Sequence, residues 1–196
     1  MATIRNRDGK TIIDWPGHTV RQIIEGAADL RGADLHGQDL HGLDLTGADL
    51  TGADLSGANL TGAHMNDAWL AGADLSGADM TGASLHGAHL AGAVLRGAHL
   101  DGVQMYCADL HEADLRDVAA CGAQMACSTL IDATIAGANL RDADLSSTDL
   151  CRADMTGADL SGCDLTGAFM DYETADALGA RLSMPAPDTP APEIGM

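Results

Sequence analysis

The amino-acid sequence predicts a solenoid, a fold built by stacking one short unit many times. From Leu30 to Met170 every fifth residue is Leu, Met or Ile, except Ala120, and this makes 29 units in one unbroken register. Each unit reads A-D-L-x-G, with a small residue two positions before the large apolar anchor and most often Gly two positions after it. Aromatic residues make up only 3% of the chain, so the core has to consist of many small, similar layers.

Residues 1–27 lie outside the repeat and are predicted to cap it. Asp8-Gly9 favours a β-hairpin with a two-residue type I′ turn, which would pair Ile4 with Ile13. A solenoid otherwise exposes its core and its open backbone edges at both ends. We therefore expect the hairpin to cover the first unit of the array.

Two further segments are expected at the ends of the array, which we place at residues 28–172. Capping-box spacing followed by apolar residues at helical spacing predicts a short helix that completes the N-terminal cap and ends near Gly26. Residues 173–196 are expected to hold a short C-terminal cap helix and a disordered tail rich in Pro and Ala. Phe169 and Tyr172 are expected to pack under this C-terminal cap.

Units such as Ala48-Asp49-Leu50-Thr51-Gly52 resemble the pentapeptide-repeat family, whose unit is written A(D/N)LXX. The resemblance implies an all-β fold, a right-handed quadrilateral β-helix in which four units make one coil. About seven coils at ~4.8 Å would then form a rod roughly 35 Å long, and side chains about 20 residues apart would stack. The anchors would point inward, among them Leu30, Leu50, Leu75, Leu95, Leu115, Leu140 and Leu160.

The array is strongly acidic. Residues 28–172 contain 22 acidic and 5 basic residues, and the whole chain has a formal net charge of −19. Spread over the rod, this is about one charge per ~2 Å, close to the one per ~1.7 Å of duplex DNA. Such a charge disfavours direct binding to nucleic acid or to an anionic membrane, and it favours a basic partner or one that normally binds DNA.

Most of this charge comes from Asp at the position before the anchor. An isolated Asp at this position is expected to bond a backbone N–H of its own turn, as Asp and Asn commonly do. Taken together, the same side chains form a regular pattern of negative charge along the rod.

The repeat is least regular between about residues 103 and 152, where Gly often gives way to other residues. Cys107 and Cys127 are predicted to stack within disulfide range, although parallel side chains favour two free thiols. Arg96 and Arg116 are also expected to stack, either as a small basic spot or, as we favour, in ion pairs with nearby Asp. The candidate interaction surface comprises Asp109, Asp114, Arg96, Arg116, Tyr106, Cys107 and Cys127.

Catalysis, cofactor binding and metal binding are not expected. A rod without insertions offers no concave, water-excluding pocket, and no two of the eight His are expected to stack in one column. The first residues carry charges where a signal peptide needs an apolar run, and the five Cys show no zinc spacing. These features predict a cytoplasmic protein with free thiols.

Two functions remain open. Some pentapeptide-repeat proteins imitate DNA, occupy the DNA-binding saddle of gyrase or topoisomerase IV and protect it from inhibitors. The resemblance therefore implies a non-enzymatic interaction module with a protein partner, of which gyrase is the most specific candidate. The alternative is a structural scaffold or spacer that displays its cap or tail to a partner. A homodimer through one end of the rod is compatible with both.

Overall fold

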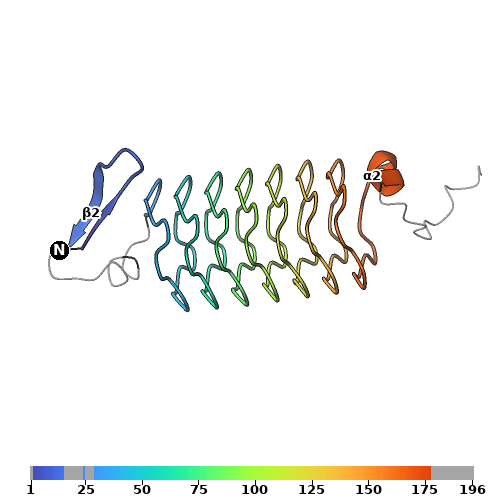
Figure 1. Cartoon of the computed structure of the whole chain (residues 1–196), viewed down its shortest axis with the longest axis horizontal. Helices are drawn as coiled ribbons and strands as arrows, with labels where there is room; N and C mark the ends of the chain where they lie inside the picture. The colour runs from blue at the N-terminus through green and yellow to red at the C-terminus, as the bar shows by residue number, and fades with distance from the viewer. Residues whose placement is uncertain (1, 16–23, 25–28, 178–196) are drawn as a thin grey trace, which may run out of the picture.

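The structure, a computed structural model, describes residues 2–15, 24 and 29–177. A stack of similar coils runs between a two-stranded hairpin and a short helix (Figure 1). Parallel bridges link each residue before an anchor to the residue 20 positions later, from Asp29–Asp49 to Asp149–Phe169. Each coil therefore contains four five-residue units, which confirms the predicted right-handed quadrilateral β-helix.

Each unit turns a corner directly after its anchor, and Leu50 illustrates the geometry. The N–H of Ala53 donates to the Leu50 carbonyl at 2.9 Å, which closes the turn. Gly52 has a φ of +65°, in the left-handed region that Gly adopts at little cost. The N–H groups of Leu50 and Gly52 donate to Trp69 and Ala71 of the next coil at 2.7 and 3.0 Å. The polar backbone groups of a unit are thus satisfied within its own turn and by the next coil.

The anchors and the small residues before them fill the interior. Ala53, Ala73 and Ala93 are 0% exposed, as the inner wall of such narrow coils requires. Leu160 is only half-buried, because it lies in the last coil and no further coil packs over it. The other anchors that the sequence singled out are at most 2% exposed: Leu30, Leu50, Leu75, Leu95, Leu115 and Leu140.

Strands β1 (Ala2–Arg5) and β2 (Thr11–Trp15) form the antiparallel hairpin at the N-terminal end. Ile4 lies opposite Ile13, the pairing that the sequence predicts. Ile4 is 2% exposed and belongs to the core, whereas Ile12 on the other face of β2 is 36% exposed. Ile13, opposite Ile4, is partly buried against the same core, so the Ile4–Ile13 side of the hairpin lies towards the array.

The connection between the two strands differs from the predicted two-residue type I′ turn. Gly9 donates to the Asn6 carbonyl at 2.8 Å and Asn6 donates to the Lys10 carbonyl at 2.9 Å, so the loop has three residues. Gly9 alone in this loop has a positive φ, +77°. The Asn6 side chain causes the difference, because its Oδ1 accepts the N–H groups of Asp8 and Lys10 at 3.1 and 2.8 Å. With this loop Arg5 lies opposite Thr11, whereas Ile4 lies opposite Ile13. Ile12 therefore has no residue opposite it in β1, and the register shifts between Ile4 and Arg5.

The hairpin contacts the first coils directly. The N–H of Asp34 donates to the Arg5 carbonyl at 2.6 Å, beside an antiparallel bridge between Asn6 and Ala33. Arg7 reaches further along the rod and forms ion pairs with Asp54 at 3.4 Å and with Asp74 at 3.3 Å. The described residues of the hairpin therefore lie against the first coils, and a cap formed by residues 1–27 as a whole stays a prediction.

The predicted helix of the N-terminal cap lies outside the described residues, apart from Ile24. This residue is helical, 1% exposed and part of the core.

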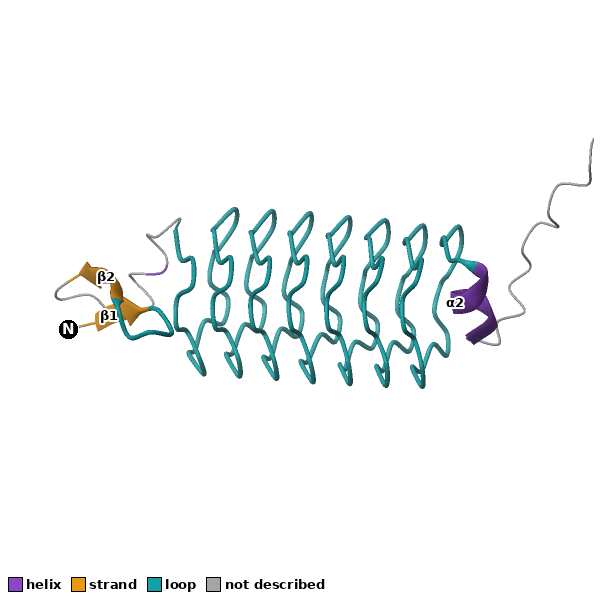
Figure 2. Cartoon of the chain, turned by 90° about the horizontal axis from the view of Figure 1, so that it is seen from above, coloured by secondary structure: helices purple, strands orange, loops and turns teal. Residues whose placement is uncertain are grey.

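Helix α2 (Tyr172–Ala177) closes the described part of the chain and lies beside the last coil (Figure 2). Asp171 caps it, because its Oδ1 accepts the Thr174 N–H at 2.8 Å. The rest of the predicted cap helix and the Pro/Ala-rich tail lie outside the described residues. The expectation that Phe169 and Tyr172 pack under this cap is wrong, since they are 66% and 83% exposed. Phe169 stands at the position before an anchor, which points outward in every coil.

Over the same described ranges, no helix has the length and apolarity needed to cross a membrane.

Replacing Leu95 by Asp would place an unpaired charge in the core, and we expect this to cost about 5 kcal/mol or more and to unfold the array. The matched control is Val94→Asp, one residue away, at the outward position where Asp is the usual residue. It should change the free energy of unfolding by less than about 1 kcal/mol. Thermal melting followed by circular dichroism checks both variants. Equal melting temperatures for the two would contradict the inward orientation of Leu95.

Candidate interaction surface

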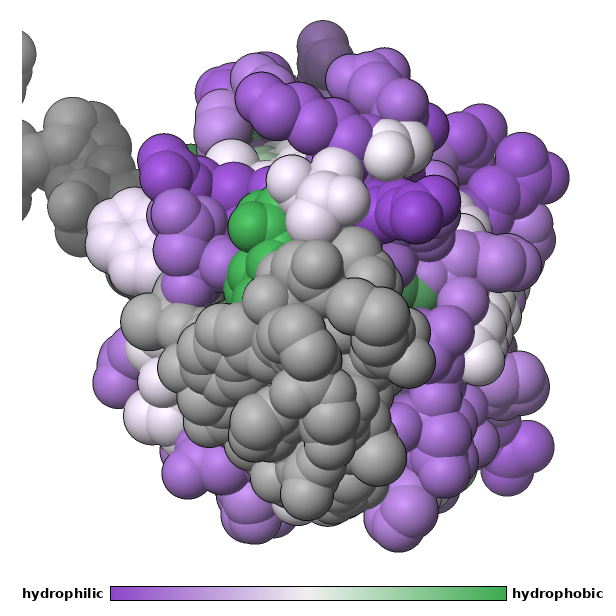
Figure 3. All heavy atoms as spheres, turned by 90° about the vertical axis from the view of Figure 1, so that its left-hand side faces the viewer, coloured by the Kyte–Doolittle hydropathy of each residue, from purple (hydrophilic) through white to green (hydrophobic). Residues whose placement is uncertain are grey.

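Three terms describe the surface of the rod. A face is the outward residue before an anchor, a corner is the pair of residues after it, and a column is a set of residues 20 apart, which the parallel bridges place on successive coils. Seen end on from the hairpin, side chains around the rim of the described residues are mostly hydrophilic (Figure 3). The one face residue and the two corner residues of each unit therefore determine the chemistry of the surface.

The Asp residues on the faces are held by their own turns. The Oδ1 atoms of Asp44, Asp74 and Asp154 accept the backbone N–H two residues later at 3.1, 3.1 and 3.0 Å. Asn59 and Asn139 make the same hydrogen bond at 3.2 and 3.3 Å. The bond thus depends on the side-chain oxygen rather than on the charge. This is the local role that the sequence predicts for a single Asp.

Hydrogen bonds of this kind lower the pKa of several carboxylates. The side-chain and backbone groups of Thr46 lower the pKa of Asp44, and those of Thr166 lower the pKa of Asp164. Hydrogen bonds from Arg31 lower the pKa of Asp29 to about 2. The rod is therefore covered with fixed negative charges at neutral pH.

Four of the five arginines of the array form ion pairs with nearby carboxylates, namely Arg31, Arg96, Arg116 and Arg152. Arg116 binds Asp114 through Nε and Nη2, with Nε 2.8 Å from Oδ1, and Arg96 Nε lies 3.8 Å from Asp117 Oδ2. The ion pairs favoured from the sequence are thus present, and no isolated basic spot remains at these two arginines. Because these side chains are about half-exposed, the pairs contribute little stability.

Nine residues other than Gly occupy the left-handed corner position, with φ between +55° and +60°. An L-residue costs roughly 1–2 kcal/mol in this conformation, so a side chain kept there points to a use for that side chain. Eight of the nine lie between residues 107 and 152, where the repeat is least regular in sequence. The nine are Asp67, Cys107, Glu112, Asp117, Cys127, Asp132, Asp142, Ser147 and Arg152.

Four of the seven predicted surface residues lie together. Tyr106, Cys107 and Cys127 lie at the same corner of two adjacent coils, and Asp109 occupies the face that follows this corner. Cys107 and Cys127 are both exposed and free. Asp109 accepts the backbone N–H of His111 at 3.1 Å.

The other three lie elsewhere. Arg96 and Arg116 belong to the corner two turns further along a four-cornered coil, which is the diagonally opposite corner, and Asp114 lies on the face before it. The seven residues therefore do not form one continuous surface. The seven residues share a location in or near the irregular part of the repeat, and this property does not determine their position around the rod.

Two stacked ring pairs beside Cys107 add residues that the candidate surface leaves out. Trp69 stacks on His89 with ring centroids 4.2 Å apart, and His86 stacks on Tyr106 at 5.1 Å. Trp69 is 52% exposed although coils pack on both sides of it. We call these four residues the aromatic patch. Their spacing of 20 in the sequence is the signal that could have identified them.

Hydrogen bonds hold one side of the aromatic patch in place. The Asn66 Oδ1 accepts the backbone N–H of His86 at 3.0 Å, and His86 Nε2 lies 3.1 Å from Gln104 Oε1. The Tyr106 hydroxyl donates to Gln124 Oε1 at 2.6 Å. The rings of His86 and Tyr106 are thus held in place by hydrogen bonds as well as by stacking.

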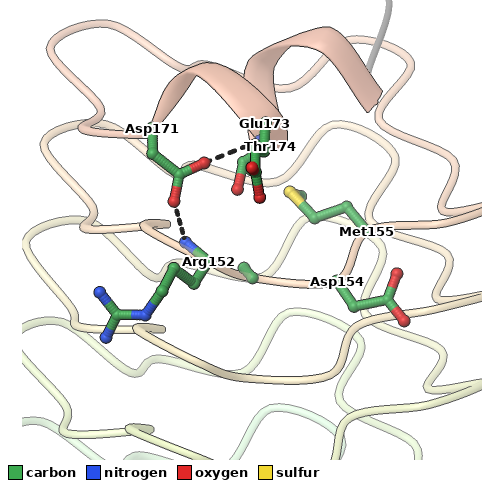
Figure 4. A pocket seen from close by; sticks show the side chains of 7 residues that line it. Arg152, Asp154, Met155, Asp171, Glu173 and Thr174 are labelled. Atoms are coloured by element: carbon green, nitrogen blue, oxygen red, sulfur yellow. Dashed lines mark hydrogen bonds between the residues drawn. The ribbon is translucent and has the colours of Figure 1, made fainter.

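A pocket of about 270 Å³ lies between the last coil and α2 (Figure 4). Asp171 joins its two walls, because it accepts the N–H of Arg152 at 2.7 Å as well as that of Thr174. Asp154 and Glu173 complete an acidic lining. Within residues 2–15, 24 and 29–177, no three His, Cys, Asp or Glu residues lie close enough to hold a metal ion.

The lowered carboxylate pKa values predict acid sensitivity in a narrow window. A carboxyl whose folded pKa lies below its ordinary value of 3.8 stabilises the fold above that pH, and the contribution is lost as the pH falls towards about 2. We expect the melting temperature to hold down to about pH 4 and to fall below it. Melting curves at constant ionic strength check this, with Asp44→Asn and Asp164→Asn as variants that keep the turn bond without titrating. A fall that begins above about pH 5 would contradict it.

Comparison with known proteins places this fold. The family model described as pentapeptide repeats matches residues 28–67, 58–97, 78–117 and 128–170. No match was found among curated proteins. A trypsin-treated form of QnrB1, a plasmid-mediated fluoroquinolone resistance protein, is similar at 21% identity and a TM-score of 0.46, over 81% of this chain and 91% of that one.

Two cyanobacterial structures are also similar. HetL from Nostoc sp. strain PCC 7120, involved in heterocyst differentiation regulation, is 26% identical with a TM-score of 0.35, over 77% of this chain and 94% of its own. The pentapeptide repeat protein alr5209 from Nostoc PCC 7120 is 29% identical with a TM-score of 0.32, over 81% of this chain and 100% of its own. With its coils of four five-residue units and a family match over most of its length, the chain belongs to the pentapeptide repeat family.

Proposed function

We propose that this protein is a non-enzymatic interaction module whose acidic rod binds a basic or DNA-binding protein in the cytoplasm, with DNA gyrase as the specific candidate. One observation supports the proposal above others. The carboxylates stand at the same position of successive units, and hydrogen bonds from their own turns fix them and lower the pKa of several. A surface of this kind presents fixed, regularly spaced negative charge, as the backbone of DNA does.

The density of charge fits this proposal. The net charge of −17 between residues 28 and 172 extends over a rod of roughly 35 Å, which approaches the linear charge density of duplex DNA. A partner that holds DNA with Lys and Arg would be steered to the rod by long-range attraction and would bind it less tightly at high salt. The same charge opposes direct binding to nucleic acid or to an anionic membrane.

Gyrase supercoiling with titrated protein tests the gyrase form of this proposal. We expect inhibition of supercoiling, or protection of gyrase from a quinolone, at micromolar protein. A variant with five face carboxylates changed to Asn should lose about tenfold or more in potency, because it removes charge and keeps the turn bonds. The five are Asp144, Asp149, Asp154, Asp159 and Asp164, whose Oδ1 atoms accept backbone N–H groups at 2.8–3.0 Å.

The control for this variant is its melting temperature, which should stay near that of the parent chain, as the natural Asn59 and Asn139 suggest. If neither inhibition nor protection occurs at micromolar concentration, gyrase is not the partner. If the variant remains as potent as the parent, the acidic faces are not the binding surface.

A scaffold or spacer is the alternative, and the continuous core favours it. Buried anchors and unbroken coil-to-coil bridges extend along the described array, so the rod can hold its two ends at a fixed distance. A spacer should tolerate the five Asn substitutions without loss of function, since they leave the core unchanged.

A homodimer through the C-terminal end is a further part of the proposal. Leu165 and Met170 of the last coil are half-buried, and Phe169 beside them is 66% exposed. Joining two such ends would bury this apolar surface. We expect sedimentation to show a dimer that Phe169→Asp converts to a monomer, whereas Trp69→Asp in the middle of the rod leaves it intact. A monomeric parent chain at micromolar concentration would refute this arrangement.

A further inference from the structure

The negative charge of the rod is interrupted in its middle. The face positions between Asp79 and Asp109 hold Ser84, His89, Val94, His99 and Gln104, so Asp is missing from a whole coil. Residues 80–108 contain one acidic and one basic residue, whereas residues 29–79 contain nine acidic and one basic, and residues 109–171 twelve acidic and three basic. We call residues 80–108 the neutral waist. It separates two acidic blocks of similar net charge.

The aromatic patch lies at the neutral waist. His86, His89 and Tyr106 lie within the neutral waist. Trp69 lies in the preceding coil and stacks on His89. In its own column Trp69 stands between Asp49 on one side and His89 on the other, because bridges link it to both. A large exposed ring is thus placed at the boundary between the acidic block and the waist.

The surface beside Trp69 carries only very small side chains. The next corner of the same two coils is formed by Ala71, Gly72, Ala91 and Gly92, with no side chain larger than a methyl group. Nothing on that side of the column rises to cover the ring, which agrees with its 52% exposure. The indole is therefore accessible from this side, and the ring face away from His89 is bordered in the column only by the shorter side chain of Asp49.

The composition of the neutral waist, taken with the aromatic patch, resembles the centre of a protein–protein interface. Such centres are poor in charged residues and rich in aromatic ones, and the charges lie around the rim. The His89 stack fixes the indole, so little side-chain entropy remains to be lost on binding. The neutral waist with the aromatic patch fits the centre, and the two acidic blocks fit the rim.

Charge and ring chemistry together select the kind of side chain that this site would bind. Trp is the aromatic side chain that attracts cations best, and Asp49, next to Trp69 in the same column, adds negative charge. Arginine suits the site better than lysine, because its planar guanidinium stacks on an aromatic face and is more weakly hydrated than an ammonium group.

We propose that Trp69, backed by His89, is the contact point for an arginine side chain of a basic protein partner, whose neighbouring cations meet the two acidic blocks. This inference rests on the proposed function in requiring a basic partner, and it does not require that the partner be gyrase.

The test uses the full chain and two fluorescently labelled peptides of equal charge, octa-arginine and octa-lysine, with fluorescence anisotropy at fixed moderate salt. We expect the parent protein to bind octa-arginine about three- to tenfold more tightly than octa-lysine. Trp69→Ala should bring the two affinities within about twofold of each other by weakening octa-arginine alone. Phe169→Ala, which removes another exposed ring from the same column, is the matched control and should keep the preference.

A second variant guards against misfolding. Trp69→Asp restores the residue that this column carries at Asp49 and Asp109, so the unit should fold. It should bind octa-lysine at least as tightly as the parent chain does and should lose the preference for arginine. A preference that survives both Trp69 substitutions overturns the inference, as does an equal loss of both peptides in Trp69→Ala. If neither peptide binds the parent chain, the proposed acidic module itself fails, which is a separate outcome.

Discussion

The structure depends on one ladder of hydrogen bonds that joins each coil to the next. In each inner unit the anchor and the second corner residue donate to carbonyl groups 19 positions later, as Leu50 and Gly52 donate to Trp69 and Ala71. Because every coil has the same length, this ladder does not shift from Leu30 to Leu150. The interior is left with space for one anchor and one small residue per unit, which explains a core of Leu, Met and Ala that lacks aromatic rings.

The same ladder determines what the surface can carry. It requires a left-handed residue at each corner, where Gly is the least costly choice, and it leaves a backbone N–H that an Asp or Asn on the face can satisfy. The acidic surface is therefore first a consequence of turn chemistry. Where the chain departs from these preferences, as at Cys107, Cys127 or Trp69, the turn does not explain the residue. Such positions are better evidence of function than the repeated Asp.

Charge and shape have different parts in the proposed binding. The fixed carboxylates attract a basic protein from a distance, but a pattern repeated on every face gives little reason to bind in one place. The neutral waist with its aromatic patch differs from the rest of the rod, and its rings are ordered by stacking and hydrogen bonds. An interaction module needs both, because attraction sets the rate of encounter and a local contact sets the position of the partner.

The sequence alone determined the period of five, the inward anchors, the local role of the Asp residues and the pairing of Ile4 with Ile13, because each depends on neighbours within one unit or one hairpin. It missed the three-residue hairpin loop, since the Asn6 side chain competes with the turn expected from Asp8-Gly9. The repeat itself does not state how many units close a coil; the tertiary structure shows four, as the family resemblance implied, which places Arg96 on the corner diagonally opposite Cys107 and stacks Trp69 on His89. The reason is physical. A five-residue pattern states which residues point outward, whereas their neighbours around and along the rod depend on how many units close one coil.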